Sequence, residues 1–287
     1  MHPYIADPIC DTLHRSSTYF VQARAMLISM HLPSPDHTIV TFAGSDALTF
    51  LQSQLTNDVA ALAVGGWQWQ GYCSAKGRLQ ATFALVRTSE DGFAAVVHNS
   101  VATTLAKRLT MFRLRSKVTI ELSTSLVATL HLIQPETAQQ PLATIALSHS
   151  RWITISAPDA ATADVATHLT FMQRWNLLGI EAMQPEITAA TAEMFVPQMI
   201  NWDHVQPGGG VSFSKGCYPG QEVVARAHYR GAVKRQIERQ ILTREIDVEV
   251  GAEVTLADGR IADVCNAALQ VQLGTIALVV AAPIETR

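Results

Sequence analysis

The sequence predicts an α+β fold, because strand-like hairpins and amphipathic helices follow one another irregularly along its 287 residues. Alternation of polar and apolar residues marks the strands, and apolar residues at spacings of three and four mark the helices. No regular βαβ alternation is present. Hydrophobic residues make up 48% of the chain and charged residues 16%, which is typical of a packed globular protein. A chain of this length is expected to form two or three structural units.

The first predicted elements are a strand and a helix separated by a glycine turn. Residues 37–42 alternate as in a strand, and Gly44-Ser45-Asp46 supplies a turn in which Ser45 is expected to cap the next helix. Five leucine and valine residues then recur at helical spacing, which places them on one core-facing side of a helix. These residues are Leu48, Leu51, Leu55, Val59 and Leu62.

A β-hairpin is predicted next. Trp67 to Ser74 and Leu79 to Arg87 have the composition of strands, and the turn between them contains Gly77 at a position expected to need a positive φ. The other predicted elements up to residue 178 are strands at 93–98, 117–122, 126–133 and 152–156 and amphipathic helices at 101–112 and 160–178.

The pattern changes near residue 235, after which short strands dominate. They are predicted at residues 236–242, 253–256 and 261–280, with breaks near Asn266 and Gly274. We therefore expect a main α+β region at residues 1–235 and a small all-β unit at 236–287. The second unit is too short to be stable alone and should dock on the first.

Charge and hydropathy exclude several classes of partner. The net charge of −3 provides no basic field for nucleic acid, so no direct nucleic-acid partner is expected. The longest apolar run, residues 276–283, is far short of the roughly 20 residues of a membrane helix, so no membrane partner is expected. Residues 1–30 lack the apolar core of a secretory signal, which predicts a cytoplasmic location.

The four cysteines are too widely spaced for a CxxC metal site, and a disulfide framework is not expected in a reducing compartment. They are Cys10, Cys73, Cys217 and Cys265. No metal site is predicted.

Cys217 has the sequence context of a reactive thiol. It lies just before a predicted short helix, residues 221–229, which is expected to stop at Gly231. The unpaired N–H groups of that helix end and the cation of Lys215 both favour the thiolate, which is the nucleophilic and metal-binding form of cysteine. The alternative is a small residue that fills a tight turn.

The sequence around Cys217 closely resembles the KGCYxGQE signature of the YgfZ family and of its mitochondrial relatives in iron–sulfur cluster assembly. The matching segment is Lys215-Gly216-Cys217-Tyr218-Pro219-Gly220-Gln221-Glu222. The resemblance covers roughly residues 35–235 and includes Lys76-Gly77-Arg78 and Phe195-Val196-Pro197-Gln198-Met199. That family is similar in fold to the aminomethyltransferase T-protein of glycine cleavage. The resemblance therefore implies a three-unit cloverleaf around a central channel that holds a tetrahydrofolate, followed by a small C-terminal β-barrel.

The resemblance also implies folate-binding residues. Trp175 matches a tryptophan that lines the folate site of the family, and Glu181 matches the carboxylate that contacts the pteridine in T-protein. The structural alternatives are a buried helix aromatic for Trp175 and a solvated helix-end charge for Glu181. A second family tryptophan aligns near His37, so this sequence departs from the family there.

The helix after Cys217 contributes further candidates. Arg226 and Arg230 are one helical turn apart and are expected to pair either with folate carboxylates or with acidic side chains of the fold. Tyr218, Gln221 and Glu222 belong to the same motif and are assigned to the folate site with them.

The resemblance implies a reduced folate as cofactor and iron–sulfur enzymes as partners. A link to tRNA methylthiolation would be indirect, because an iron–sulfur enzyme installs that group. T-protein carries adjacent aspartates after the glycine turn of its second hairpin, whereas residues 77–82 here contain no carboxylate that could act as a general base. We therefore expect a protein that supports assembly or repair of iron–sulfur enzymes through Cys217. The alternatives are a folate-binding accessory without catalysis and a folate-dependent aminomethyl transferase.

Overall fold

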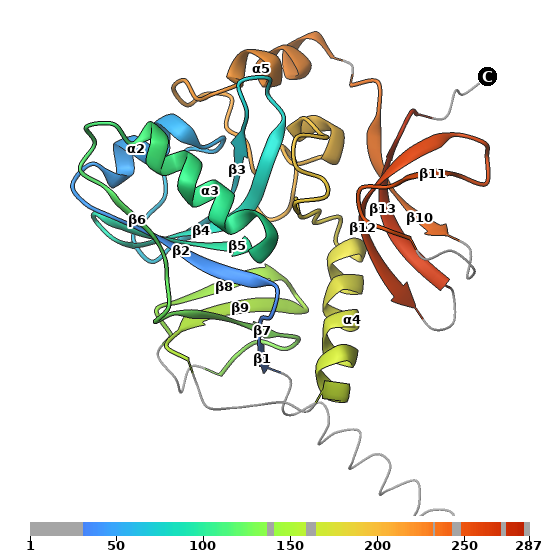
Figure 1. Ribbon diagram of the computed structural model, residues 1–287, viewed down its shortest axis with the longest axis horizontal. Helices are drawn as coiled ribbons and strands as arrows, with labels where there is room; N and C mark the ends of the chain where they lie inside the picture. Colours follow the sequence, from blue (N-terminus) through green and yellow to red (C-terminus); the bar gives the residue numbers. More distant parts are fainter. Residues whose placement is uncertain are drawn as a thin grey trace, which may run out of the picture. The chain divides into compact units, whose positions relative to one another are not determined.

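In a computed structural model, the helices and strands of the described residues are interleaved with no βαβ repeat, which confirms the α+β class (Figure 1). Described residues from Leu32 onward belong to one compact unit. Cys10 lies outside the described residues. The described ranges are 31–136, 141–158, 165–231, 233–242, 248–270 and 274–283.

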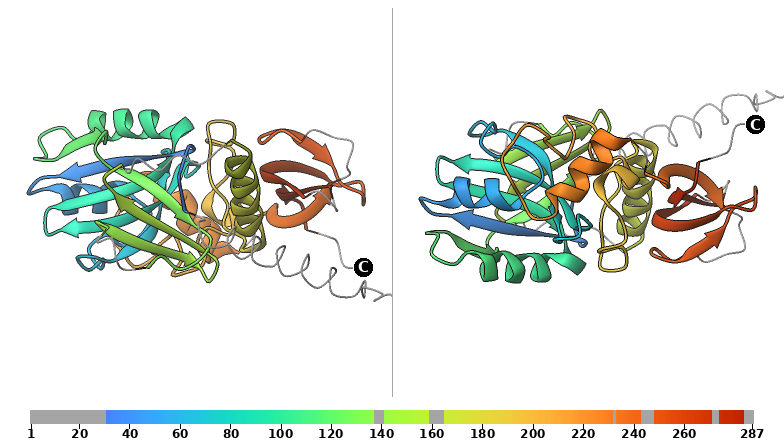
Figure 2. Two further views of the ribbon diagram at one scale, coloured as in Figure 1. Left: turned by 90° about the horizontal axis from the view of Figure 1, so that it is seen from below. Right: turned by 90° about the horizontal axis from the view of Figure 1, so that it is seen from above.

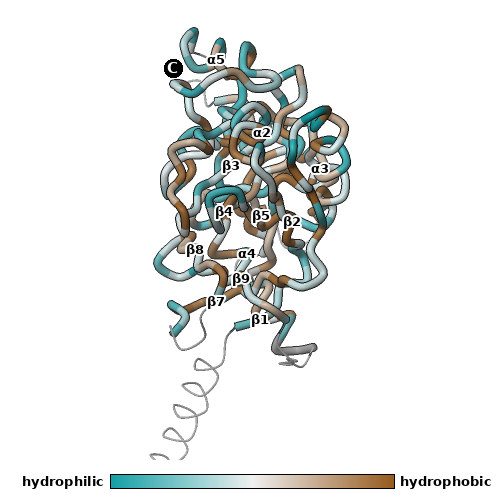
Figure 3. The backbone as a smooth tube through the Cα atoms, turned by 90° about the vertical axis from the view of Figure 1, so that its left-hand side faces the viewer, coloured by the Kyte–Doolittle hydropathy of each residue, from teal (hydrophilic) through white to brown (hydrophobic). Residues whose placement is uncertain are grey.

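A five-stranded antiparallel sheet carries the largest core. Its strand order is β3-β4-β5-β2-β6. The helices α2 (Ala47–Gln54) and α3 (Asn99–Phe112) bury their apolar faces against this sheet. Much of the hydrophobic colour in Figure 3 accordingly follows these strands. The strands are β2 (His37–Ala43), β3 (Trp67–Cys73), β4 (Leu79–Ser89), β5 (Gly92–His98) and β6 (Thr119–Leu122).

The predicted β3–β4 hairpin is confirmed, and Gly77 in its turn has φ of 70°. The helix before it is shorter than predicted. It ends at Gln54 because Leu55 is extended and bridges to Tyr72. Apolar residues beyond the helix end remain fully buried, since the following loop packs on the same core. The prediction that Ser45 caps α2 is wrong, because Asp46 occupies the N-cap position.

A four-stranded sheet has the order β1-β7-β9-β8. Its strands are β1 (His31–Pro33), β7 (Val127–His131), β8 (Ala143–Ser148) and β9 (Arg151–Ser156). We did not predict β1 or β8 from the sequence. The strand β8 nevertheless alternates buried and accessible residues, which is the pattern of a half-buried strand. The helix α4 (Val165–Glu181) follows this sheet.

The C-terminal sheet has the order β10-β13-β12-β11, and its first strand in the chain begins at Gln236. The described strands form an open sheet with β10 and β11 as edges, so the predicted β-barrel is wrong. Within the described residues β10 and β11 do not pair with each other, so the sheet does not close. The helix α4 packs against β12 and β13, as both views in Figure 2 show. The strands are β10 (Gln236–Leu242), β11 (Glu253–Thr255), β12 (Ile261–Gln270) and β13 (Gly274–Ala281).

The helix predicted after the cysteine motif is confirmed as α5 (Gln221–Arg230), and it ends at Gly231 with φ of 63°. Among the described helices none combines the length and apolar character needed to cross a membrane.

Candidate functional site

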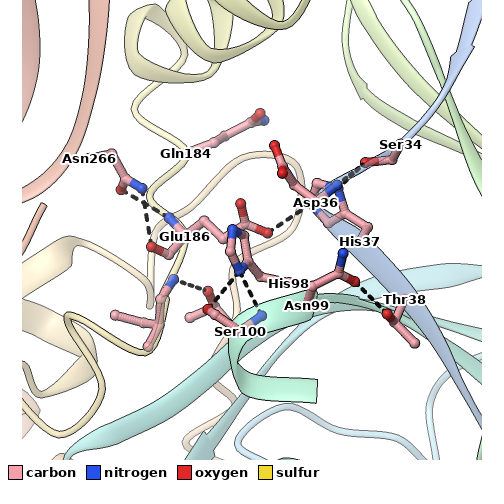
Figure 4. Close-up of polar contacts among 12 residues, drawn as sticks. Ser34, Asp36, His37, Thr38, His98, Asn99, Ser100, Gln184, Glu186 and Asn266 are labelled. Atoms are coloured by element: carbon pink, nitrogen blue, oxygen red, sulfur yellow. Dashed lines mark hydrogen bonds and ion pairs between the residues drawn. The ribbon is translucent and has the colours of Figure 1, made fainter. Parts of the chain in front are cut away.

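A pocket of about 200 Å³ is lined by residues from all three sheets, from α4 and from the segment after α4. Six of its residues contribute the polar and stacking groups of the site, and several of them are drawn in Figure 4. They are His37, Arg151, Trp175, Gln184, Glu186 and Asn266.

One wall of the pocket is a stack of flat groups. The indole of Trp175 is buried in α4 and lies parallel to the ring of Phe171, with 6.4 Å between ring centroids and 12° between planes. The guanidinium carbon of Arg151 lies 4.2 Å from the centroid of the Trp175 ring. Gly179 permits this approach, because a Cβ there would lie 2.7 Å from Arg151 Nη1. Trp175 therefore lines the pocket with the Arg151 cation stacked on its ring.

Arg151 is held in place by an amide. Its Nη1 donates to Gln184 Oε1 at 2.9 Å, and Gln184 Nε2 in turn donates to the carbonyls of Leu147 and Gln206, both at 2.7 Å. Burial lowers the pKa of Arg151 to about 10, although the negative charge of Glu186 opposes the shift. Arg151 Nε is buried and has no hydrogen-bond partner among the described residues.

A carboxylate and an imidazole in the pocket lining are hydrogen-bonded directly to each other. His37 Nε2 lies 2.9 Å from Glu186 Oε1, and His37 Nδ1 lies 2.6 Å from Ser34 Oγ. Burial alone would lower the pKa of His37, but the charge and hydrogen bond of Glu186 outweigh it and raise that pKa. Burial likewise opposes ionisation of Glu186, yet His37 holds the pKa of Glu186 below its usual value. The favoured state is an ion pair.

The backbone of Glu186 is clamped by a residue of the C-terminal sheet. Glu186 N–H donates to Asn266 Oδ1 at 3.1 Å, and Asn266 Nδ2 donates to the carbonyl oxygen of Glu186 at 3.2 Å. Asn266 follows a β-bulge in β12, where Cys265 is the extra residue between Val264 and Asn266. Bulges turn a side chain in a new direction, and Figure 4 shows the Asn266 amide pointing at Glu186.

Of the two residues predicted to contact the pteridine, one lines the pocket. Trp175 lines the pocket, whereas Glu181 is exposed at the end of α4 and is not among the residues lining the described pocket. Glu186, five positions further on, is the carboxylate that lines it. The sequence signal for Glu186 was the proline before it, which prevents the helix from continuing and leaves the next side chain on a loop. His37 occupies the pocket where a family tryptophan was expected.

Lys215 is largely buried and bound to backbone rather than free. Its ammonium donates to the carbonyl oxygens of Gln52 and Leu55, both at 2.5 Å, and of Asn57 at 3.2 Å. Burial lowers the pKa of Lys215 to about 8, opposed by the charge of Asp58. Through these bonds Lys215 holds the end of α2 and the residues after it against the cysteine motif.

Two glycines bring the hairpin turn against the start of α5. A Cβ on Gly220 would lie 2.7 Å from the Cα of Gly77, and a Cβ on Gly77 would lie 2.7 Å from Val223 Cβ. Tyr218 is buried between these segments, and burial followed by the neighbouring Cys73 raises its pKa. The two motifs that carry the resemblance thus meet in space.

The remaining candidates are the cysteines and the residues of α5. Cys217 is exposed, while Cys73 and Cys265 are buried and burial raises the pKa of each to about 12. Gln221 is half-buried, and Glu222, Arg226 and Arg230 are exposed on α5. Within the described chain, none of the candidates in the cysteine motif or α5 lines the pocket. Of the candidate residues predicted from the sequence, Trp175 lines the pocket. The candidates in the cysteine motif and in α5 form a separate group away from the pocket lining.

No metal cluster was predicted, and the described residues contain no group of three or more His, Cys, Asp or Glu side chains arranged to hold a metal ion. His228 stacks on Phe213 with ring centroids 3.7 Å apart, and His204 Nε2 lies 3.6 Å from the carboxylate of Asp203.

No protein-family model matches the sequence. The chain is 33% identical over 219 residues to the tRNA-modifying protein YgfZ of Vibrio vulnificus (strain YJ016), which covers 70% of this chain and 66% of that protein. It is 33% identical over 247 residues to the protein of the same name from Sodalis glossinidius, with 75% and 73% covered. It is 34% identical over 227 residues to the protein of the same name from Escherichia coli (strain K12 / DH10B), and the match covers 70% of this chain and 68% of that protein. The chain thus spans about two thirds of the length of these relatives.

Among solved structures, the fold is similar to the glycine cleavage system aminomethyltransferase T from Bartonella henselae. The TM-score is 0.61 over 86% of this chain and 76% of that one, at 13% sequence identity. At that identity the likeness concerns the fold alone.

Proposed function

Because this chain belongs to the YgfZ family, we propose that it binds a reduced folate in the pocket and supports iron–sulfur enzymes through the thiol of Cys217. The observation that carries the proposal is the meeting of a flat stack and a held carboxylate in one pocket. The stack is formed by Trp175 with Arg151, and the carboxylate is that of Glu186.

These groups fit the pteridine head of a folate. A pteridine is flat, presents adjacent N–H donors on its amino edge and carries acceptors elsewhere on the ring. The guanidinium–indole stack offers a flat surface, and Glu186 Oε2 offers an acceptor. The pocket of about 200 Å³ is smaller than the roughly 300–1,000 Å³ of typical sites for whole drug-sized ligands, so it matches the head rather than the full cofactor.

The glutamate tail of the folate would extend out of the pocket. A tail carboxylate prefers guanidinium partners because these donate two parallel hydrogen bonds. We keep Arg226 and Arg230 as its proposed partners, since both are exposed on α5. When bound, the folate would supply a carrier for one-carbon units; the residues named here hold and orient it.

Cys217 is the proposed contact with iron–sulfur enzymes. Its thiol is exposed, so it can reach a cluster or a thiol of a client protein, unlike the buried Cys73 and Cys265. The relatives are named as tRNA-modifying proteins. We propose that any effect of this chain on tRNA is indirect and passes through an iron–sulfur enzyme that modifies tRNA, because the net charge of −3 gives no basic surface field.

The aminomethyl transferase alternative is less well supported. After the hairpin glycine this chain has Gln80 and Thr82 where a carboxylate base would be required. The amide of Gln80 donates to Glu193, and Thr82 Oγ1 accepts from the N–H of Ile187 at 2.9 Å. Neither an amide nor a hydroxyl group is basic enough to accept a proton from an amine at neutral pH.

Calorimetric titration with 5-formyltetrahydrofolate tests the proposal. The wild type should bind saturably, and Glu186→Gln should weaken binding by about 10- to 100-fold because a charged acceptor is lost. Glu181→Gln is the matched control and should change affinity less than about twofold, since Glu181 is exposed outside the pocket. Absence of binding to the wild type would refute the folate site.

The thiol is tested separately. Cys217→Ala should retain folate affinity while the activity of an iron–sulfur enzyme falls in cells that depend on this protein. Equal enzyme activity with Cys217→Ala and wild type would remove Cys217 from the function and leave a folate-binding accessory.

A further inference from the structure

Glu186 is held at three points by residues far away in sequence. Its carboxylate is bonded by His37, 149 positions earlier, and both polar groups of its backbone are bonded by Asn266, 80 positions later. The side chain of Glu186 is still 35% exposed, whereas that of His37 is 9% exposed. Two residues from distant parts of the chain thus hold Glu186 in place.

We propose that His37 and Asn266 are positioning residues that present the second oxygen of Glu186 to the pocket as a fixed acceptor, so that the site selects ligands with adjacent N–H donors. This inference rests on the proposed folate site and deepens it by naming the edge of the ligand that is recognised. For a reduced folate that edge is the 2-amino group together with N3–H.

The geometry explains why two positioning residues are needed. Asn266 fixes the position of the Glu186 backbone, which leaves the side chain free to rotate. His37 restricts that rotation by bonding Oε1, so that both lone pairs of Oε2 remain for the ligand. A carboxylate that is already immobile loses little conformational entropy when the ligand binds, which strengthens discrimination between ligands.

The same geometry disfavours a ligand that presents an acceptor to Glu186 instead of a donor. A ring that presented a carbonyl oxygen in place of the amino group would face Glu186 with two acceptors and no proton between them. His37 cannot relieve this repulsion, because its Nε2 proton is already donated to Oε1 and Nδ1 is paired with Ser34. Selection thus follows from the absence of a spare donor in the His37–Glu186 pair.

The charge on His37 matters in addition to its hydrogen bond. Ligand binding covers Glu186 and removes water from its carboxylate, which is costly unless a cation stays beside it. The other charged or titratable groups facing the pair are Asp36, His98 and Arg151. His98 makes no hydrogen bond to Glu186 in the described structure; its Nδ1 accepts the N–H of Ser100 at the start of α3.

The test compares 5-formyltetrahydrofolate with an otherwise identical analogue that lacks the 2-amino group, using calorimetry on the full chain between pH 6 and 9. The wild type should favour the parent by about 10- to 100-fold near pH 6. This preference should shrink as pH rises and His37 loses its proton.

Four variants separate positioning from simple structural support. His37→Ala and Asn266→Asp should bring the preference to within about threefold of unity, the latter because the introduced carboxylate would turn an acceptor toward the Glu186 carbonyl. His37→Gln restores a donor to Oε1 without a charge, so part of the preference should return and become independent of pH. His98→Asn keeps an N-cap for α3 and should retain both the preference and its pH dependence. Thermal unfolding checks that each variant is folded.

The outcomes distinguish the two proposals. If the wild type binds neither ligand, the folate site and this inference both fail. If it binds both ligands equally, or if His37→Ala and Asn266→Asp keep the full preference, the folate site stands and the positioning role is refuted. A pH-independent preference in the wild type would likewise refute the role of the His37 charge.

Discussion

His37 Nε2 lies 2.9 Å from Glu186 Oε1, and the imidazole reaches that carboxylate from the first residue of β2. The pair joins the five-stranded sheet to the segment that follows α4. Because the contact is ionic, the stability that it confers depends on pH, and the direction of that dependence follows from the two pKa shifts.

The free energy of unfolding should contain a contribution from this pair that is greatest in mildly acidic solution. The pKa of His37 is raised, so its contribution is complete below about pH 6.5 and is lost as pH rises through the folded-state value. The pKa of Glu186 is lowered, so its contribution is present above about pH 4.3 and is lost as pH falls through the folded-state value. Urea unfolding of the wild type and His37→Gln from pH 5 to 9 measures the difference. A difference that grows above pH 7 would contradict the ion pair.

The three described cysteines should react with iodoacetamide at very different rates. Cys217 is exposed, while burial raises the pKa of Cys73 and of Cys265 to about 12. Alkylation at pH 7.5, followed by mass mapping of each peptide, should find Cys217 at least about 100-fold faster than the other two. Equal rates under native conditions would mean that the buried thiols open to solvent. Urea-unfolded protein, in which all sites should react alike, is the control.

Replacing Lys215 should destabilise the fold. Lys215→Met leaves the carbonyls of Gln52, Leu55 and Asn57 without their shared donor, and we expect a loss of about 2–4 kcal/mol in the free energy of unfolding. Lys76→Met is a suitable control, because Lys76 is exposed in the hairpin turn and should cost less than about 0.5 kcal/mol. A small loss for Lys215→Met would indicate that water replaces the ammonium.

Two glycines close together in sequence should respond differently to alanine. A Cβ on Gly210 would lie 2.2 Å from Nε1 of the buried Trp202, so Gly210→Ala should cost about 1–3 kcal/mol. No atom lies within 4 Å of a Cβ on Gly216, and Gly216→Ala should cost less than about 0.5 kcal/mol. Chemical denaturation of both variants checks this difference. Similar stabilities would show that the Trp202 loop can shift.

Local sequence signals predicted the local elements. Gly77 indicated the hairpin turn and Gly231 the end of α5, because a positive φ or a helix stop is a property of a few neighbouring residues. The end of α2 was missed because Leu55 and Val59 continue the helical spacing while packing from a loop. Spacing alone does not distinguish a helix from a loop that buries the same side chains.

The pocket was only partly predictable for a related reason. Trp175 was found through the resemblance, whereas Glu186 depends on contacts with His37 and Asn266 that no local pattern encodes. Lys215 was expected to act on Cys217 through its charge. Its three backbone bonds instead arise from tertiary packing against the loop after α2, which the motif itself does not reveal.

The bulge at Cys265 limits how the gene can change in length. Side chains along a strand alternate between faces, so gaining or losing one codon at the bulge would turn the amide to the opposite face of the sheet. Point substitutions on the outer face of β12 leave this register intact. Lineages that carry the Asn266–Glu186 contact should therefore vary in composition along β12 while keeping its residue count, and length changes should collect in its flanking turns.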